Sequence, residues 1–241
     1  MSFLPSVLLA ALTSSEAIIT ILNSPASTSA TRYAEAQEIL QREADEGKPL
    51  QRFVFGVTAK DSPKAKAYRE SSREKIRYLA EEKDSPLAWY LLSLETNNLD
   101  MLKRAADGGN VQALNAYGTL IIQMAFAKHA PSNTLEMALS RGYDCFRRAA
   151  AKKDPNGYIN LGTCYLRGFG CDINLELAHQ CFRSAAEAGH PEGMDYVSAN
   201  FELGHGVERN SSLALAWRMK AKAVRGDKAA EEWLKSGKML K

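Results

Sequence analysis

The 241-residue sequence has few of the features that mark several protein classes. It contains only four cysteines and four histidines, with no C-x-x-C pair, which argues against a zinc site and against a dense disulfide framework. The net charge of +3 is too small to indicate nucleic-acid binding by itself. The apolar fraction of 45% and charged fraction of 24% are typical of a globular protein. We therefore expect reduced cysteines, no nucleic-acid partner, and a cytoplasmic or other intracellular location, with an exported form as the alternative.

The N-terminal apolar run, Val7 to Leu12, has to be considered as a signal peptide. No Lys or Arg precedes it, whereas a secretory signal normally begins with positive residues. The run is also too short to span a bilayer. We expect an amphipathic or buried first helix, with a signal as the alternative. Thr13 and Glu16 then offer a capping box for a second helix, Ser14 to Leu22.

Two stretches near the C-terminus repeat each other with a period of 36 residues. Residues 155–190 read PNGYINLGTCYLRGFGCDINLELAHQCFRSAAEAGH, and residues 191–226 read PEGMDYVSANFELGHGVERNSSLALAWRMKAKAVRG. The positions that match at this one offset include Pro155, Gly157, Tyr165 (Phe201), Ala178 and the G-x-G of each copy. Repeats of this length are typical of stacked helix pairs.

Each copy is predicted to form two helices joined by a glycine turn. Asp154 and Pro155 suit the N-cap and the first position of one helix. Gly168 and Gly170 then end it, because glycine readily adopts the left-handed conformation found at helix C-termini. A second helix begins near Asn174 and carries an apolar stripe. Such a pair cannot cover its own apolar faces, so it must stack on the next copy.

These positions resemble the Sel-one-like repeat (SLR), a variant of the tetratricopeptide helix pair that carries two glycines in its turn. The second copy departs from the pattern at Ser198, where a mid-helix glycine such as Gly162 is expected at a close helix contact. The resemblance implies an all-α fold, an α-α superhelix in which antiparallel helix pairs form a right-handed solenoid. The matching residues are Leu161, Gly162, Tyr165, Gly168, Gly170, Ala178, Ala185, Ala186 and Gly189 in the first copy, and Phe201, Gly204, Gly206, Val207, Ala214, Trp217, Lys220, Ala221 and Gly226 in the second.

Upstream of these copies the pattern weakens. Residues 103–120 look like the end of one unit and the start of another, but Ala105 and its equivalent Ala149 are 44 residues apart and the G-x-G is missing. Earlier still we expect helices around Tyr33–Glu46, Leu50–Thr58 and Lys64–Glu82, without diagnostic glycines. We therefore expect an irregular helical N-terminal region at 1–83 (a cap or degenerate repeats), repeats at 84–226, and a C-terminal capping helix at 227–241.

No set of residues points to catalysis. The G-F-G of the turn follows a helix, lacks a G-K-[ST] ending and occurs in two copies, so it does not fit a phosphate-binding loop. Cys145 and Cys181 lie 36 residues apart and fit packing positions, while a bridge from Cys164 to another repeat cysteine is the alternative in an exported protein. His179 and His190 are expected at the surface or at a boundary. We expect no catalytic residue, no cofactor and no metal.

The remaining candidate is the solenoid surface. In stacked helix pairs the first helices line the concave side, where peptides and partner helices bind. The sequence thus predicts a non-catalytic scaffold or adaptor for a protein or peptide partner, acting as a monomer or as a subunit of a complex. The alternatives are a structural subunit that docks through its N-terminal helices, and a β-lactamase-like hydrolase, which is disfavoured because the regular cysteine pair of such SLR relatives is missing. The candidate partner-binding residues are Asn160, Thr163, Arg167, Tyr196 and Glu202.

Overall fold

The computed structural model describes residues 22, 30–59, 62–127 and 131–236, and over these residues the chain is helical without strands. The expected segments Val7–Leu12 and Ser14–Leu22 lie outside this part, apart from Leu22 itself. None of the described helices is long and apolar enough to cross a membrane. The twelve helices of the described residues are α2 (Ala30–Asp45), α3 (Pro49–Thr58), α4 (Pro63–Glu81), α5 (Pro86–Thr96), α6 (Leu99–Asp107), α7 (Val111–Ala127), α8 (Ser132–Ala151), α9 (Pro155–Arg167), α10 (Leu175–Glu187), α11 (Pro191–Leu203), α12 (Ser211–Val224) and α13 (Lys228–Lys235).

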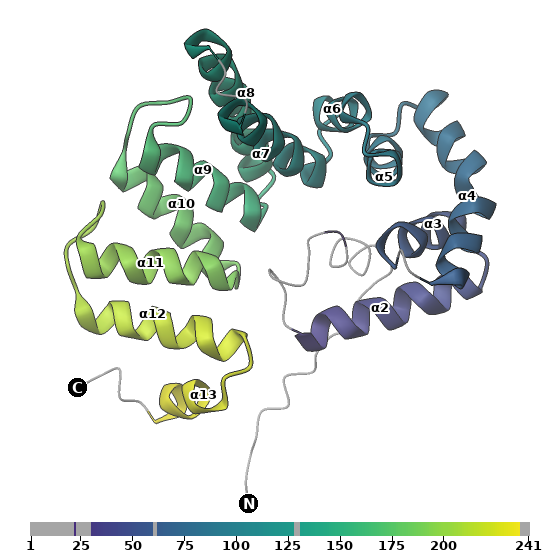
Figure 1. The fold of residues 1–241 in the computed structure, drawn as a ribbon. Coiled ribbons are helices and arrows are strands. Elements are labelled where there is room, and N and C mark those ends of the chain that lie inside the picture. Colours follow the sequence, from purple (N-terminus) through teal and green to yellow (C-terminus); the bar gives the residue numbers. More distant parts are fainter. Residues whose placement is uncertain (1–21, 23–29, 60–61, 128–130, 237–241) are drawn as a thin grey trace, which may run out of the picture.

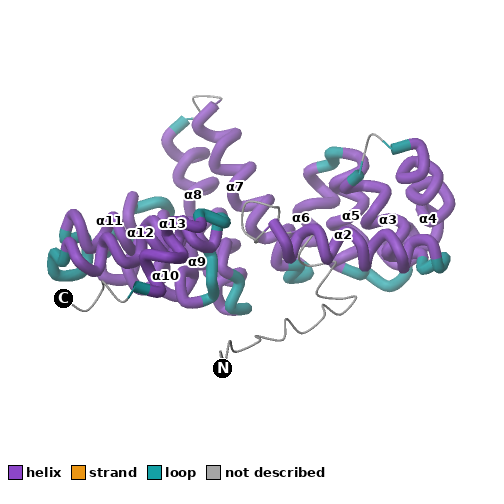
Figure 2. The backbone as a smooth tube through the Cα atoms, turned by 90° about the horizontal axis from the view of Figure 1, so that it is seen from below, coloured by secondary structure: helices purple, strands orange, loops and turns teal. Residues whose placement is uncertain are grey.

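The helices pack as consecutive antiparallel pairs that follow an open arc (Figure 1). We call the first helix of each pair A and the second B, so that α3, α5, α7, α9 and α11 are A helices. Neighbouring A helices contact each other directly, α7 with α9 and α9 with α11, whereas the B helices lie farther apart. This difference in spacing bends the stack and leaves the A helices on its inner side. The hairpin α7–α8 stands out from the rest of the arc (Figure 2).

The clearest unit, α9–α10, forms for local reasons that its sequence displays. The Asp154 side chain accepts a hydrogen bond from the Gly157 N–H at 2.8 Å, and Pro155 occupies the first helical position. Gly168 ends α9 with a φ of 72°, in the left-handed region. Asn174 then caps α10 by accepting from the Leu177 N–H. The next unit repeats the arrangement, with Gly204 after α11 and Asn210 before α12.

Close helix contacts hold each A helix on its own B helix. A Cβ at Gly162 would lie 2.7 Å from the Phe182 ring, so only glycine fits between α9 and α10. The same contact recurs one unit earlier, where Gly118 faces the Phe146 ring. In the next unit Ser198 takes the glycine position, and its hydroxyl donates to the Ala214 carbonyl at 2.7 Å. The pair α7–α8 is therefore a third unit of the same design, although its longer helices shift the spacing in the sequence.

The helices before the repeats agree with the sequence prediction. Those expected around Tyr33–Glu46, Leu50–Thr58 and Lys64–Glu82 are found as α2, α3 and α4, with ends that agree within one turn. Arg73 of α4 donates to Glu95 at the end of α5, which ties this region to the helix pairs that follow. One continuous core cluster extends from α2 to α8, so that the N-terminal helices and the stack share their apolar packing.

The expectation that His179 and His190 lie at the surface or at a boundary is wrong. Both side chains are buried, 7% and 4% exposed. His179 packs edge-on against Phe201 of α11, and its Nδ1 lies 3.4 Å from the Asn200 side chain. His190 stands before α11 at the position that Asp154 has before α9, and its side chain is buried there. Neither of its ring nitrogens has a hydrogen-bond partner.

We expect His190→Asn to stabilise the protein. His190 does not cap α11, whereas Asn at this position supplies an acceptor for an N–H of the first turn. Restoring an N-cap is worth about 1 kcal/mol of unfolding free energy, measured by urea denaturation at pH 7.5. Lower stability of His190→Asn at that pH would contradict this assignment.

The same substitution should reduce the sensitivity of the fold to acid. Burial, and then the charge of Arg225, hold the pKa of His190 below its ordinary value of 6.5. The unfolded chain therefore takes up a proton more readily than the folded chain, and stability falls as the pH drops below 6.5. Between pH 7.5 and 5.5 we expect His190→Asn to lose less stability than the wild type. His205→Asn, which changes a histidine outside a capping position, is the control and should follow the wild type.

Candidate functional site

A groove of about 500 Å³ opens on the inner side of the arc, where α5, α6, α7 and α9 meet. A second hollow of about 340 Å³ adjoins it and shares four residues with it, Tyr90, Leu102, Ala116 and Leu120. We call the two together the amide groove, because side-chain amides form much of its rim. The residues that line the 500 Å³ part are Leu22, Tyr90, Leu102, Gln112, Asn115, Ala116, Thr119, Leu120, Gln123, Asn156 and Asn160.

Helix periodicity explains why α7 contributes most of this surface. Residues three or four apart lie on one face of a helix. Gln112, Asn115, Thr119 and Gln123 follow that spacing and present polar side chains along one edge. Ala116 and Leu120, displaced by one position, supply an apolar strip beside them. Since α9 packs next to α7, its residues Asn156 and Asn160 extend the polar edge into the next unit.

A hydrogen-bonded chain orients the amides between α7 and α9. The Asn160 amide donates to the Asn115 side-chain oxygen at 3.1 Å, and the Asn115 amide donates to Asp154 Oδ2 at 2.7 Å. Asp154 in turn caps α9. Burial raises the pKa of Asp154, while the hydrogen bonds from Gly157 and Asn115 oppose that shift. The amide orientation is thus tied to the cap of the helix and is set before any ligand arrives.

No Asp, Glu, Lys, Arg or His lines either part of the amide groove among the described residues. Its floor contains Tyr90, which is 6% exposed and whose pKa burial raises to about 12, so the phenol stays protonated. An amide offers both a donor and an acceptor, as a peptide bond does. The groove therefore matches an uncharged segment with apolar side chains and free backbone groups better than it matches an ionic ligand.

The sequence-predicted partner-binding residues lie in different surroundings. Asn160 lines the amide groove. Thr163 is half-buried, and its hydroxyl donates to the Ile159 carbonyl of its own helix. Arg167 is exposed at the end of α9, and Tyr196 stacks on Phe182 with ring centroids 4.2 Å apart. Glu202 is exposed and pairs with Arg218 of α12. The structure brings Asn160 to the groove, packs Tyr196 of α11 against α10, and leaves Glu202 exposed in an ion pair with α12.

Sequence reasoning missed the α7 part of the groove, although a signal was present. Ala105 and Ala149 already relate the two units by an offset of 44 residues. Applied to Asn160, Thr163 and Arg167, this offset gives Ala116, Thr119 and Gln123, all of which line the groove. Subtracting 44 from the numbers of the candidate residues would therefore have identified the α7 part of the groove from the sequence.

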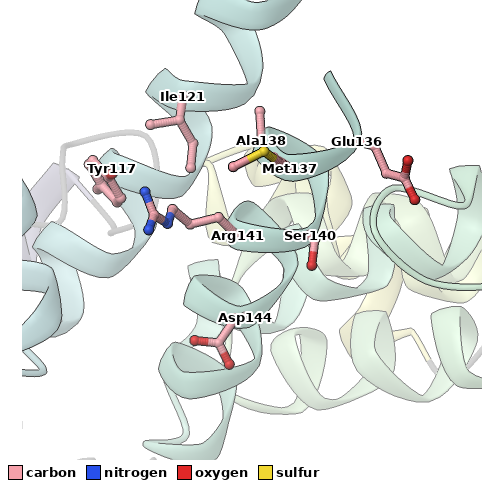
Figure 3. A pocket seen from close by; sticks show the side chains of 8 residues that line it. All are labelled: Tyr117, Ile121, Glu136, Met137, Ala138, Ser140, Arg141 and Asp144. Atoms are coloured by element: carbon pink, nitrogen blue, oxygen red, sulfur yellow. The ribbon is translucent and has the colours of Figure 1, made fainter. Parts of the chain in front are cut away.

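A separate hollow of about 670 Å³ lies between α7 and α8 (Figure 3). It forms because α7 and α8, of 17 and 20 residues, extend past the shorter α5 and α6, of 11 and 9 residues. Arg141 reaches toward Tyr117 and Ile121, whereas Glu136 lies on the opposite side (Figure 3). These charged side chains do not converge on one point, so they form no acid–base pair.

The cysteines are not activated as nucleophiles. Burial raises the pKa of Cys145 and Cys181 to about 11 and that of Cys164 to about 12, and it also raises the pKa of Cys171. All four are free thiols, and their protonated form is a weak nucleophile at neutral pH. Within the described part of the chain, no group of three or more His, Cys, Asp and Glu residues could hold a metal ion.

Comparison with known proteins identifies the repeats. The Sel1 repeat model matches residues 155–190 and 191–217. The fold is similar to that of a protective antigen from uropathogenic Escherichia coli strains with an SLR fold, at a TM-score of 0.54 and 21% identity. That match covers 86% of this chain and 46% of the antigen, so this chain spans about half of the antigen's length.

A Sel1 repeat protein from Oxalobacter formigenes also aligns, with a TM-score of 0.45 and 23% identity over 52% of this chain and 90% of that one. A search of curated proteins found no match. The chain is therefore an all-helical, SLR-type α-α superhelix that carries two Sel1 repeats, at residues 155–190 and 191–217.

Proposed function

We propose that this protein is a non-catalytic interaction scaffold that binds a segment of a partner protein in the amide groove. The observation that carries the proposal is the groove itself, which crosses three successive A helices and combines an apolar floor with an amide rim. Sel1 repeats typically mediate protein interactions, which supports the same reading.

Recognition in this groove uses two kinds of contact. Apolar side chains of the partner pack on Ala116 and Leu120, and Leu120 is 37% exposed in the free protein and gains burial there. The amides of Asn115 and Asn160 and the hydroxyl of Thr119 exchange hydrogen bonds with the partner's backbone or polar side chains. Because Asn115 and Asn160 are already hydrogen-bonded to each other, little side-chain freedom is lost when a ligand binds.

A pair of charge-matched double variants tests the proposal. Thr119→Arg with Gln123→Arg places two long cations in the groove, where no charged residue is present in the described structure. Gln180→Arg with Ser212→Arg adds the same charge at exposed positions of the B helices α10 and α12. Far-UV circular dichroism first checks that both variants keep the helical content of the wild type.

We expect the groove variant to lose at least tenfold in the amount of a specific partner recovered from the source cells by affinity purification. A loss of this size corresponds to about 1.4 kcal/mol of binding free energy. The B-helix variant should recover the same partner as the wild type does. If all three proteins recover the same partners in equal amounts, the groove is not the binding surface.

A further inference from the structure

The hydrogen bonds between α7 and α9 fix the direction in which the Asn115 amide points. Its Nδ2 lies 2.7 Å from Asp154 Oδ2 and 3.2 Å from the Val111 carbonyl oxygen. A backbone carbonyl can only accept, and Asp154 Oδ2 already accepts from the Gly157 N–H at 2.8 Å. The Asn115 atom between these two oxygens is therefore the nitrogen, and both of its N–H groups are used within the protein.

The next hydrogen bond fixes the Asn160 amide in the same way. Because the Asn115 nitrogen is turned toward Asp154, the Asn115 Oδ1 faces Asn160 and accepts from its Nδ2 at 3.1 Å. No described residue donates a hydrogen bond to the Asn160 Oδ1. Asn160 is half-buried and lines the amide groove, so this oxygen is the open end of the chain. We call Asp154, Asn115 and Asn160 the amide relay.

The amide relay makes this end of the groove a better acceptor than donor. An amide that donates an N–H gains electron density on its own oxygen, and the relay ends at a carboxylate, so the Asn160 Oδ1 is polarised as an acceptor. Only one side-chain N–H of the two amides, on Asn160, stays unused. No charged side chain of the described residues lines the groove, so a cation would lose its hydration there without meeting a carboxylate. The matching group on a ligand is an uncharged N–H donor.

We propose that Asn160 is a specificity-determining residue of the amide groove, where its Oδ1 accepts an uncharged amide N–H of the ligand. Asn115 and Asp154 are positioning residues, because they fix the orientation of Asn160 without needing to touch the ligand. The inference rests on the proposed function, since it names the group that a partner segment presents here: a free backbone N–H or a side-chain amide, next to an apolar side chain that packs on Leu120. A segment whose N–H groups are all bonded internally, as in the middle of a helix, lacks this group.

Two small probes that differ in one group test this preference on the full-length chain. Benzamide carries an amide NH₂ beside an aromatic ring, and acetophenone has a methyl group in its place. Binding to the ¹⁵N-labelled protein is followed by NMR, and the side-chain amide signals of Asn160 and Asn156 report where each probe lies. We expect benzamide to bind about fivefold more tightly than acetophenone, a gain typical of one hydrogen bond, and to shift the Asn160 signals. Equal affinity of the two probes, or no binding of benzamide at Asn160, overturns the proposal.

Three leucine substitutions separate the acceptor from the residues that position it. Asn160→Leu removes the Oδ1, and Asn115→Leu keeps Asn160 but leaves its amide free to turn. In both variants we expect the ratio of the two probe affinities to fall to about one. Asn156→Leu makes the same change at a half-buried residue that lines the groove outside the relay, and it should keep the wild-type ratio.

A preference for benzamide that survives in Asn160→Leu contradicts the role of Asn160, and one that survives in Asn115→Leu contradicts the role of the relay. The comparison of the two probes on the wild-type chain decides the proposal even if a variant does not fold.

The probes and the charged groove variant test different claims. If the two probes bind equally well while Thr119→Arg/Gln123→Arg loses its cellular partner, the groove binds the partner and only the acceptor role of Asn160 is wrong. If benzamide is preferred while that variant keeps its partner, the acceptor role of Asn160 stands and the proposed function fails.

Discussion

Gly206→Ala is expected to lower the unfolding free energy by about 3 kcal/mol or more, although it adds only one methyl group. Gly206 has a φ of 68°, and a Cβ on it would lie 2.0 Å from the Leu175 carbonyl oxygen. Leu175 is the first residue of α10, so the turn after α11 rests on the start of the preceding B helix. The second glycine of G-x-G therefore permits stacking of one repeat on the next. Urea unfolding followed by circular dichroism measures the loss.

Gly189→Ala is the matched control for this prediction. Gly189 also has a positive φ, of 86°, but no atom lies within 4 Å of the place where its Cβ would be. In this variant the unfolding free energy should fall by roughly 1 kcal/mol, because only the left-handed backbone conformation of the alanine is unfavourable. An equal loss of unfolding free energy in Gly206→Ala and Gly189→Ala would show that the close contact between Gly206 and the Leu175 backbone contributes nothing to stability.

Phe182→Ala is expected to cost about 3 to 5 kcal/mol, because it removes a large and fully buried ring from the centre of the Sel1 repeats. The ring fills the space that the missing side chain of Gly162 leaves, and it stacks on Tyr196 at an interplanar angle of 11°. Its loss therefore weakens both the contact within the α9–α10 pair and the contact between α10 and α11. Thermal and urea unfolding should show the loss as a shift of the main transition.

Leu177→Ala on the same helix is the control, since Leu177 is 37% exposed. It should cost less than about 1 kcal/mol, as substitutions of partly exposed residues usually do. A loss for Phe182→Ala no larger than that for Leu177→Ala would mean that the Gly162–Phe182 contact does not hold the helix pair together.

The fold could be predicted where the repeat keeps its period. The 36-residue offset placed the turns at Gly168 and Gly204 and the helix starts at Asp154 and Asn174, and the helices are found there. The unit formed by α7 and α8 was harder to recognise in the sequence for two reasons. Its longer helices raise the distance between equivalent residues of successive units from 36 to 44, and the G-x-G motif is missing from its turn. Its Gly118–Phe146 contact, which matches Gly162–Phe182, becomes visible only in three dimensions.

The candidate site could be predicted less well than the fold. The position of Asn160 on an A helix follows from periodicity, but its bond to Asn115 joins residues 45 positions apart and depends on how α7 and α9 stack. The burial of His190, in the turn between two repeats, was likewise not visible from the sequence. A single sequence reports the spacing within a unit more directly than it reports contacts between units.

Site-specific photo-crosslinking in the cells that make this protein tests the scaffold proposal most directly. A benzoylphenylalanine at position 123 places the reactive group in the amide groove, and one at position 180 places it on the exposed surface of α10. We predict that irradiation joins a partner protein to position 123 and not to position 180. A chain that crosslinks to no other protein at position 123, or that gives the same adducts from both positions, would contradict binding in the groove.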